Sequence, residues 1–214
     1  GSIGPSGKLP SGNDPDLSNI TFDELGQVFY TQAKGLVEGG ADVLLIETSQ
    51  DILEVKAAIW GINRYFEDAG VRIPIQAQIT LDTSGRMLFG TDIASALATL
   101  EALQIDVLGI NCSTGPEYMR EPIRYLVEHS PMPISVLPNA GLPLNVDGEA
   151  VYPMEPEPFS DMVAEFARWG VSVVGGCCGT HAEHLSQLYQ KVHGHSYEDE
   201  LEHRAKRRAP TERQ

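Results

Sequence analysis

The three cysteines of the chain are the residues whose type and spacing most clearly indicate chemistry. Cys177 and Cys178 are neighbours in the segment GGCCGT, and Cys112 lies upstream in the segment GINCSTGP. Three thiolates suit Zn²⁺, which prefers soft ligands in a tetrahedral arrangement, and the fourth position stays open for water or substrate. Together with Zn²⁺ they carry a net charge of −1, which favours alkylation of a bound sulfur over Lewis-acid hydrolysis.

The backbone around the cysteine pair must turn if both thiols are to reach one ion. Adjacent side chains on a regular strand point to opposite faces, so an extended segment would separate them. Glycine precedes the pair at Gly175 and Gly176 and follows it at Gly179, and glycine adopts backbone conformations that other residues avoid. We therefore expect a turn at this point.

Three other interpretations of these residues are open. An isolated cysteine is most often an ordinary buried thiol, although a third cysteine at a second rim loop favours the metal site. His181 and His184 give a rival ligand set of the form CCxxHxxH, although an exposed histidine pair at a helix start is the simpler interpretation. A redox role for Cys177 and Cys178 is disfavoured, because adjacent cysteines form only a strained ring and redox motifs have two intervening residues.

The elements that must position these cysteines follow a regular repeat. Short β-branched runs recur at intervals of about thirty residues, with segments of helical period between them, and this alternation predicts a parallel α/β fold. Residues 2–4 are a further short candidate strand. The five longer runs cover residues 43–47, 75–79, 107–111, 134–137 and 171–175.

Two architectures fit this repeat, an open doubly wound sheet and a closed (β/α)8 barrel of the TIM type. The chain has no GxGxxG or Walker lysine loop, which disfavours the nucleotide-binding sheet. Polar or thiol residues follow several strand ends, and in a barrel those ends meet at one mouth. Glu47 is such a residue, and its carboxylate suits either a buried core position or an anchor for a substrate ammonium group.

The chain is shorter than the barrel that it predicts. A (β/α)8 barrel needs about 250 residues, and residues 1–195 supply only about five to six βα units. We therefore expect an incomplete barrel domain over 1–195, with the first two strands missing, followed by a polar linker or tail over 196–214.

Composition excludes several classes of partner. The chain has 214 residues, of which 42% are hydrophobic, and its 30 acidic and 15 basic residues give a net charge of −15. This charge argues against nucleic acid and anionic lipid as partners. No apolar run is long enough to cross a membrane, and the first residues do not resemble a signal peptide, so we expect a cytoplasmic protein.

The motifs GGCCGT, GINCxxGP and PNAGLP together resemble those of the homocysteine S-methyltransferase family. The chain is most similar to the homocysteine-binding domains of cobalamin-dependent methionine synthases, and the resemblance runs from Gly4 to about Val192. It implies a zinc barrel whose ligands are Cys112, Cys177 and Cys178. It also implies that Glu47 lies near the amino group of homocysteine.

The same resemblance implies a reaction and its partners. Asn139 is expected near the metal, filling its fourth position when substrate is absent. Homocysteine would replace this ligand, lose its thiol proton and accept a methyl group to give methionine. In the members that the chain most resembles, methylcobalamin on another domain is the donor, and the cobalamin and folate domains of the same larger enzyme are the partners. Other relatives use betaine, S-methylmethionine or a folate-linked route.

Two family features are absent from the sequence. Members open with a strand that carries Asp-Gly-Gly or Asp-Gly-Ala, and a second strand ends in Glu-Thr-Asn-Thr; both help to hold homocysteine. We therefore expect a fragment of a larger enzyme, a chain completed by a partner, or self-association across an open barrel edge. A zinc- and homocysteine-binding module without turnover is the alternative to an active methyltransferase domain.

Overall fold

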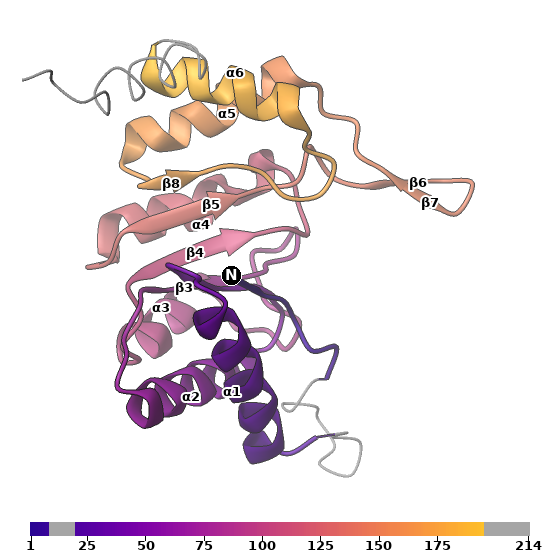
Figure 1. The fold of residues 1–214 in the computed structure, drawn as a ribbon. Coiled ribbons are helices and arrows are strands. Elements are labelled where there is room, and N and C mark those ends of the chain that lie inside the picture. The colour runs from indigo at the N-terminus through magenta and orange to yellow at the C-terminus, as the bar shows by residue number, and fades with distance from the viewer. Residues whose placement is uncertain (9–19, 195–214) are drawn as a thin grey trace, which may run out of the picture.

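The computed structural model describes residues 1–8 and 20–194, which form a six-stranded parallel sheet with helices between the strands (Figure 1). The spatial order of the strands is the same as their order in the chain. This sheet consists of β1 (Ser2–Ile3), β2 (Leu44–Ser49), β3 (Ile75–Ile79), β4 (Val107–Asn111), β5 (Ile134–Leu137) and β8 (Val173–Val174).

One helix separates each pair of successive strands, and one more follows β8. Because right-handed crossovers between sequential parallel strands place their helices on the same face, this order is that of a barrel wall. A doubly wound sheet would instead reverse its strand order at a switch point. The helices are α1 (Phe22–Glu38), α2 (Ile52–Ala69), α3 (Ile93–Glu101), α4 (Pro116–His129), α5 (Pro156–Trp169) and α6 (Ala182–His193).

The barrel is not closed within the described residues. β1 and β8 form the two edges of the sheet, and no pairing joins them in this part of the chain. Figure 1 shows the strand–helix units stacked in chain order, from the α1–α2 pair at the bottom to the α5–α6 pair at the top. The prediction of a partial (β/α) barrel with about five to six units is confirmed.

The two faces of the sheet differ in polarity because side chains alternate along each strand. Leu44 and Ile46 of β2 are buried in the main hydrophobic core, and β3 to β5 contribute further buried Ile, Leu, Ala and Val residues. The residues between them face the other side and include Glu47, Gln78 and Asn111. The helices therefore cover an apolar face, and the polar face carries the candidate chemistry.

A β-hairpin extends from the sheet between β5 and α5 (Figure 1). Its strands β6 (Leu144–Val146) and β7 (Glu149–Val151) are antiparallel.

No helix in residues 1–8 and 20–194 is long and apolar enough to cross a membrane. The expected linker at 196–214 lies outside the described residues.

Candidate metal centre

A left-handed turn after β4 positions Cys112. Cys112 has φ 61° and the following Ser113 has φ 64°, a region that non-glycine residues occupy at an energetic cost. Two backbone hydrogen bonds fix the turn: the Cys112 N–H donates to Leu137 O at 3.1 Å, and the Thr114 N–H donates to Cys112 O at 2.8 Å. The chain thus turns sharply where the thiol is presented.

The cysteine pair after β8 is held against the loop that follows β5. The Cys177 N–H donates to Pro138 O at 2.8 Å, and Cys178 O accepts from the Ala140 N–H at 2.9 Å. The Cys178 N–H donates to Asn139 Oδ1 at 3.1 Å. These contacts continue the pairing of β5 and β8 beyond their ends, so the position of the cysteines follows from strand adjacency.

The glycines around the pair have two different roles. Gly179 has φ 77°, as expected for the predicted turn. Gly176 has no positive φ; a Cβ there would lie 2.4 Å from Thr180 Cγ2, so it is required for close approach. The predicted conformational freedom is therefore found at Gly179, after the pair rather than before it.

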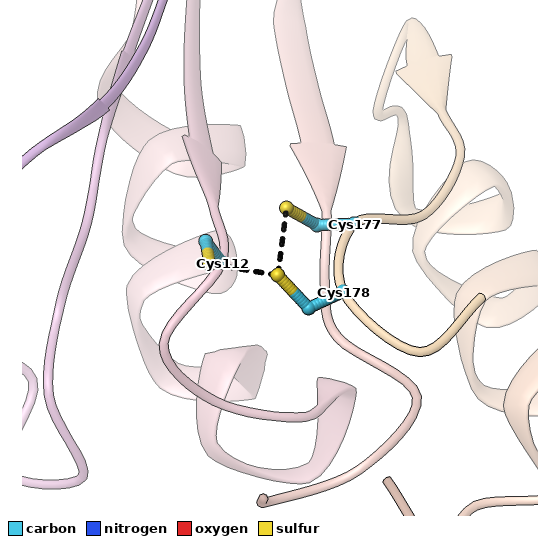
Figure 2. A group of neighbouring side chains, drawn as sticks. All are labelled: Cys112, Cys177 and Cys178. Carbon is cyan, nitrogen blue, oxygen red and sulfur yellow. Dashed lines mark hydrogen bonds between the residues drawn. The ribbon is translucent and has the colours of Figure 1, made fainter. Parts of the chain in front are cut away.

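The three sulfurs converge beyond the carboxyl ends of β4 and β8 (Figure 2). The Cys112 and Cys178 sulfurs are 3.7 Å apart, the Cys177 and Cys178 sulfurs are 4.0 Å apart, and all three lie within 4.8 Å of one another. Tetrahedral zinc with Zn–S bonds of about 2.3 Å requires sulfurs roughly 3.8 Å apart. The donor set and its spacing therefore fit a zinc ion with one open position.

The electrostatics of the cluster favour a thiolate. A hydrogen bond from the Cys177 thiol is the largest influence on Cys112, and with the Ser113 N–H it lowers the pKa of Cys112 to about 6 against the opposing effect of burial. The same shared hydrogen bond raises the pKa of Cys177, with burial in the same direction. Cys112 is thus the first of this pair to lose its proton, and a cation would favour loss of the others.

Asn111 is a site residue that the sequence interpretation missed. Its side chain is fully buried; Nδ2 donates to Thr48 Oγ1 at 2.8 Å and contacts the Cys177 sulfur at 3.9 Å. Its Oδ1 accepts from the Thr48 N–H at 2.8 Å, and Thr48 has a left-handed φ of 58°. Asn111 therefore joins the end of β2 to the cysteine cluster. Its position directly before Cys112 in the segment GINC is the sequence signal that could have identified it.

Asn139 and Glu47 occupy different parts of the site. Asn139 is 1% exposed and contacts the backbone of Cys178, so the structure brings it into the cluster. Glu47 is half-buried on β2, and its carboxylate accepts a hydrogen bond from the Ser2 hydroxyl. β3 lies between Glu47 and the strand that leads to Cys112.

The rival ligand set does not assemble around the cysteines. His184 is 2% exposed, its Nε2 pairs with Met154 O at 2.9 Å and its Nδ1 accepts from the His181 N–H at 3.4 Å. The simpler interpretation of an exposed pair is thus wrong for His184. Within residues 1–8 and 20–194, the three cysteines form the only group of three or more His, Cys, Asp or Glu side chains close enough for one ion.

The sequence of this chain matches a known family over most of its length. The model of the homocysteine S-methyltransferase family covers residues 1–192. The chain belongs to this family. It is 42% identical over 193 residues to the methionine synthases of Mycobacterium leprae (strain TN) and Mycobacterium tuberculosis (strain ATCC 25618 / H37Rv). The match covers 90% of this chain but only 16% of either relative.

Solved structures of a homocysteine methyltransferase support the fold. The apo form of the homocysteine methyltransferase MmuM from Escherichia coli superimposes with a TM-score of 0.67 at 21% identity, covering 89% of this chain and 60% of MmuM. Its metallated form gives a TM-score of 0.59 at 22% identity, covering 76% of this chain and 51% of MmuM. At these identities, the comparison establishes the shared fold.

Proposed function

We propose that this chain is a zinc-dependent homocysteine S-methyltransferase domain in which Cys112, Cys177 and Cys178 hold the metal. The observation that carries this proposal is the convergence of three sulfurs at zinc spacing in a member of this family. When bound there, zinc supplies a positive charge that lowers the pKa of the homocysteine thiol and keeps its sulfur in place.

The residues of the chain itself supply position and charge. Glu47 faces the polar side of the sheet, where its carboxylate suits the substrate ammonium group. Asn139 and Asn111 contact Cys178 and Cys177 from two sides and so hold the two thiols in place. Asn139 would also supply the fourth ligand of the bound metal when substrate is absent. In the transfer, the homocysteine proton leaves to solvent, the sulfur–methyl bond forms, and the bond to the donor breaks with its electron pair. Orientation of the two reactants is the main contribution of the protein.

We assign methylcobalamin on another domain as the methyl donor, with homocysteine as the substrate. The support is the identity to proteins named methionine synthase, of which this chain spans only 16% of the length. The cobalamin and folate domains of the same larger enzyme are then its partners. Residues 196–214 are the proposed linker toward the next domain.

The alternative function is a zinc- and homocysteine-binding module without turnover. The open sheet favours it, because among the described residues the segment next to Glu47 is only the two-residue strand β1. Val173 on the other edge strand is 39% exposed, and self-association across the open edge would cover it.

The experiment that separates the two functions is a methyl-transfer assay with the zinc-loaded chain. Homocysteine is mixed with methylcobalamin, S-methylmethionine, betaine or methyltetrahydrofolate, and methionine is measured by mass spectrometry. We expect methionine with methylcobalamin and none with Cys112→Ser. Stoichiometric zinc without methionine from any donor would contradict catalysis by this chain and favour the binding module.

A further inference from the structure

A β-bulge interrupts β2 at Glu47–Thr48, the segment that carries the proposed substrate anchor. Ile46 pairs with Ala77 of β3, and the next registered pair joins Ser49 to Ile79, so β2 has one residue more than β3 between these pairs. A bulge of this kind changes the direction in which side chains point. Ile46 and Ser49 are both 2% exposed, whereas Glu47 and Thr48 are half-buried. The bulge therefore directs two successive polar side chains away from the hydrophobic core.

Thr48 is the strained residue of this bulge. Its φ is 58°, in the left-handed region that a β-branched residue occupies only when its surroundings hold it there. Because Thr48 directly follows Glu47, its backbone conformation sets the course of the chain next to the anchor. The direction of the Glu47 side chain thus depends on keeping Thr48 in this conformation.

The Asn111 side chain holds Thr48 by two hydrogen bonds. Its Oδ1 accepts from the Thr48 N–H at 2.8 Å, and its Nδ2 donates to Thr48 Oγ1 at 2.8 Å. Asn111 is itself fully buried, and its backbone O accepts from the Thr80 hydroxyl at 2.9 Å. The Thr80 N–H donates in turn to Ser49 O at 2.9 Å. These contacts join the carboxyl ends of β2, β3 and β4 at the bulge.

We propose that Asn111 is a positioning residue for substrate binding, which holds Thr48 in its left-handed conformation and so keeps the Glu47 carboxylate directed at the substrate ammonium group. This inference rests on the proposed function, because it takes Glu47 as the ammonium anchor. Asn111 also contacts the Cys177 sulfur at 3.9 Å, so one side chain joins the anchor to the proposed metal ligands. It thereby fixes the separation between the sites for the thiol and the ammonium group of one substrate molecule.

Two thiols that differ only in the ammonium group separate these two contacts of Asn111. The probes are homocysteine and 4-mercaptobutyrate, and calorimetry on the zinc-loaded chain gives the ratio of their affinities, which we call the homocysteine preference. A change at the cysteines alters both affinities equally, whereas a change at Glu47 alters the preference. In Asn111→Ala, we expect the homocysteine preference to fall about 10-fold.

A second substitution tests whether the conformation of Thr48 is the cause. Glycine adopts the left-handed conformation without strain, so Asn111→Ala combined with Thr48→Gly should regain most of the homocysteine preference. Glycine would not reverse a general loss of packing, because it adds further freedom to the chain.

Two more variants complete the test. Thr48→Val removes the hydroxyl that accepts from Asn111, at a half-buried position, and the preference should fall again even if Asn111→Ala does not fold. Asn145→Ala is the matched control: Asn145 Oδ1 accepts from the Gly148 N–H at 2.9 Å at another left-handed turn, and its loss should leave the preference unchanged.

The outcomes separate this inference from the function on which it rests. If the unchanged chain prefers homocysteine and Asn111→Ala keeps that preference, or weakens both thiols equally, the positioning role is overturned and the ammonium anchor stands. Failure of Thr48→Gly to restore the preference also overturns the role, since it indicates general disruption. If the unchanged chain binds the two thiols equally or binds neither, the proposed substrate site fails and this inference fails with it.

Discussion

The two ends of the strand order differ in how completely they build a site. On the β4, β5 and β8 side, which we call the complete side, the segments at the strand ends are hydrogen-bonded to one another, including Cys112 N–H to Leu137 O and Cys177 N–H to Pro138 O. On the β1 and β2 side, which we call the open side, β1 has two residues and Glu47 contacts Ser2. The proposed metal centre thus needs only three adjacent strands, whereas the proposed substrate pocket around Glu47 depends on the open side. Zinc binding and homocysteine binding should therefore be separable.

Replacing a proposed metal ligand on the complete side should have the largest effect, a loss of zinc affinity. In Cys112→Ser, a hydroxyl that stays protonated at neutral pH replaces a thiolate, so we expect zinc affinity to fall by more than about 100-fold. Chelator competition measures this change. The matched control is His181→Gln, which alters the rival ligand set at an exposed position and should retain zinc. Tight zinc binding by Cys112→Ser would refute the three-thiolate site.

Removing a hydrogen bond that supports a proposed ligand on the complete side should have an intermediate effect on zinc affinity. In Asn139→Ala, the Cys178 N–H loses its acceptor, and we expect zinc affinity to fall about 10–100-fold. The unfolding free energy of the metal-free chain should fall by about 1–3 kcal/mol, measured by denaturant titration. Asn145→Ala is the control, because Asn145 Oδ1 accepts from the Gly148 N–H at 2.9 Å in the exposed hairpin. Equal zinc affinities in both variants would exclude Asn139 from the site.

A substitution on the open side should have the smallest effect. It should weaken homocysteine binding and leave zinc affinity unchanged. In Glu47→Gln, the carboxylate for the substrate ammonium is lost, and a contribution of about 1.4 kcal/mol corresponds to roughly 10-fold weaker homocysteine binding. Calorimetry on the zinc-loaded chain measures it, with the exposed Glu101→Gln as control. A parallel loss of zinc affinity would show that the two sides are not separable.

The sequence predicted the architecture well because strand and helix periods are local properties. Residues 75–79, 107–111 and 134–137 form strands with those bounds. The last strand is shorter than predicted: β8 covers only Val173–Val174, because its pairing with β5 gives way to the loop that carries the cysteines. How far a strand continues depends on its neighbour, which a local pattern does not contain.

The same distinction between local patterns and contacts with neighbouring segments applies to the candidate site. The sequence by itself determined the three thiols, the zinc chemistry that they suit and the strand–helix repeat that carries them. Only the tertiary structure decided which groups surround them. Asn111, at the end of β4, reaches the Cys177 sulfur, and the His184 ring is held away from the cysteines by its contact with Met154 O. These contacts join segments distant in the sequence, and their geometry is set by strand adjacency and packing rather than by spacing along the chain.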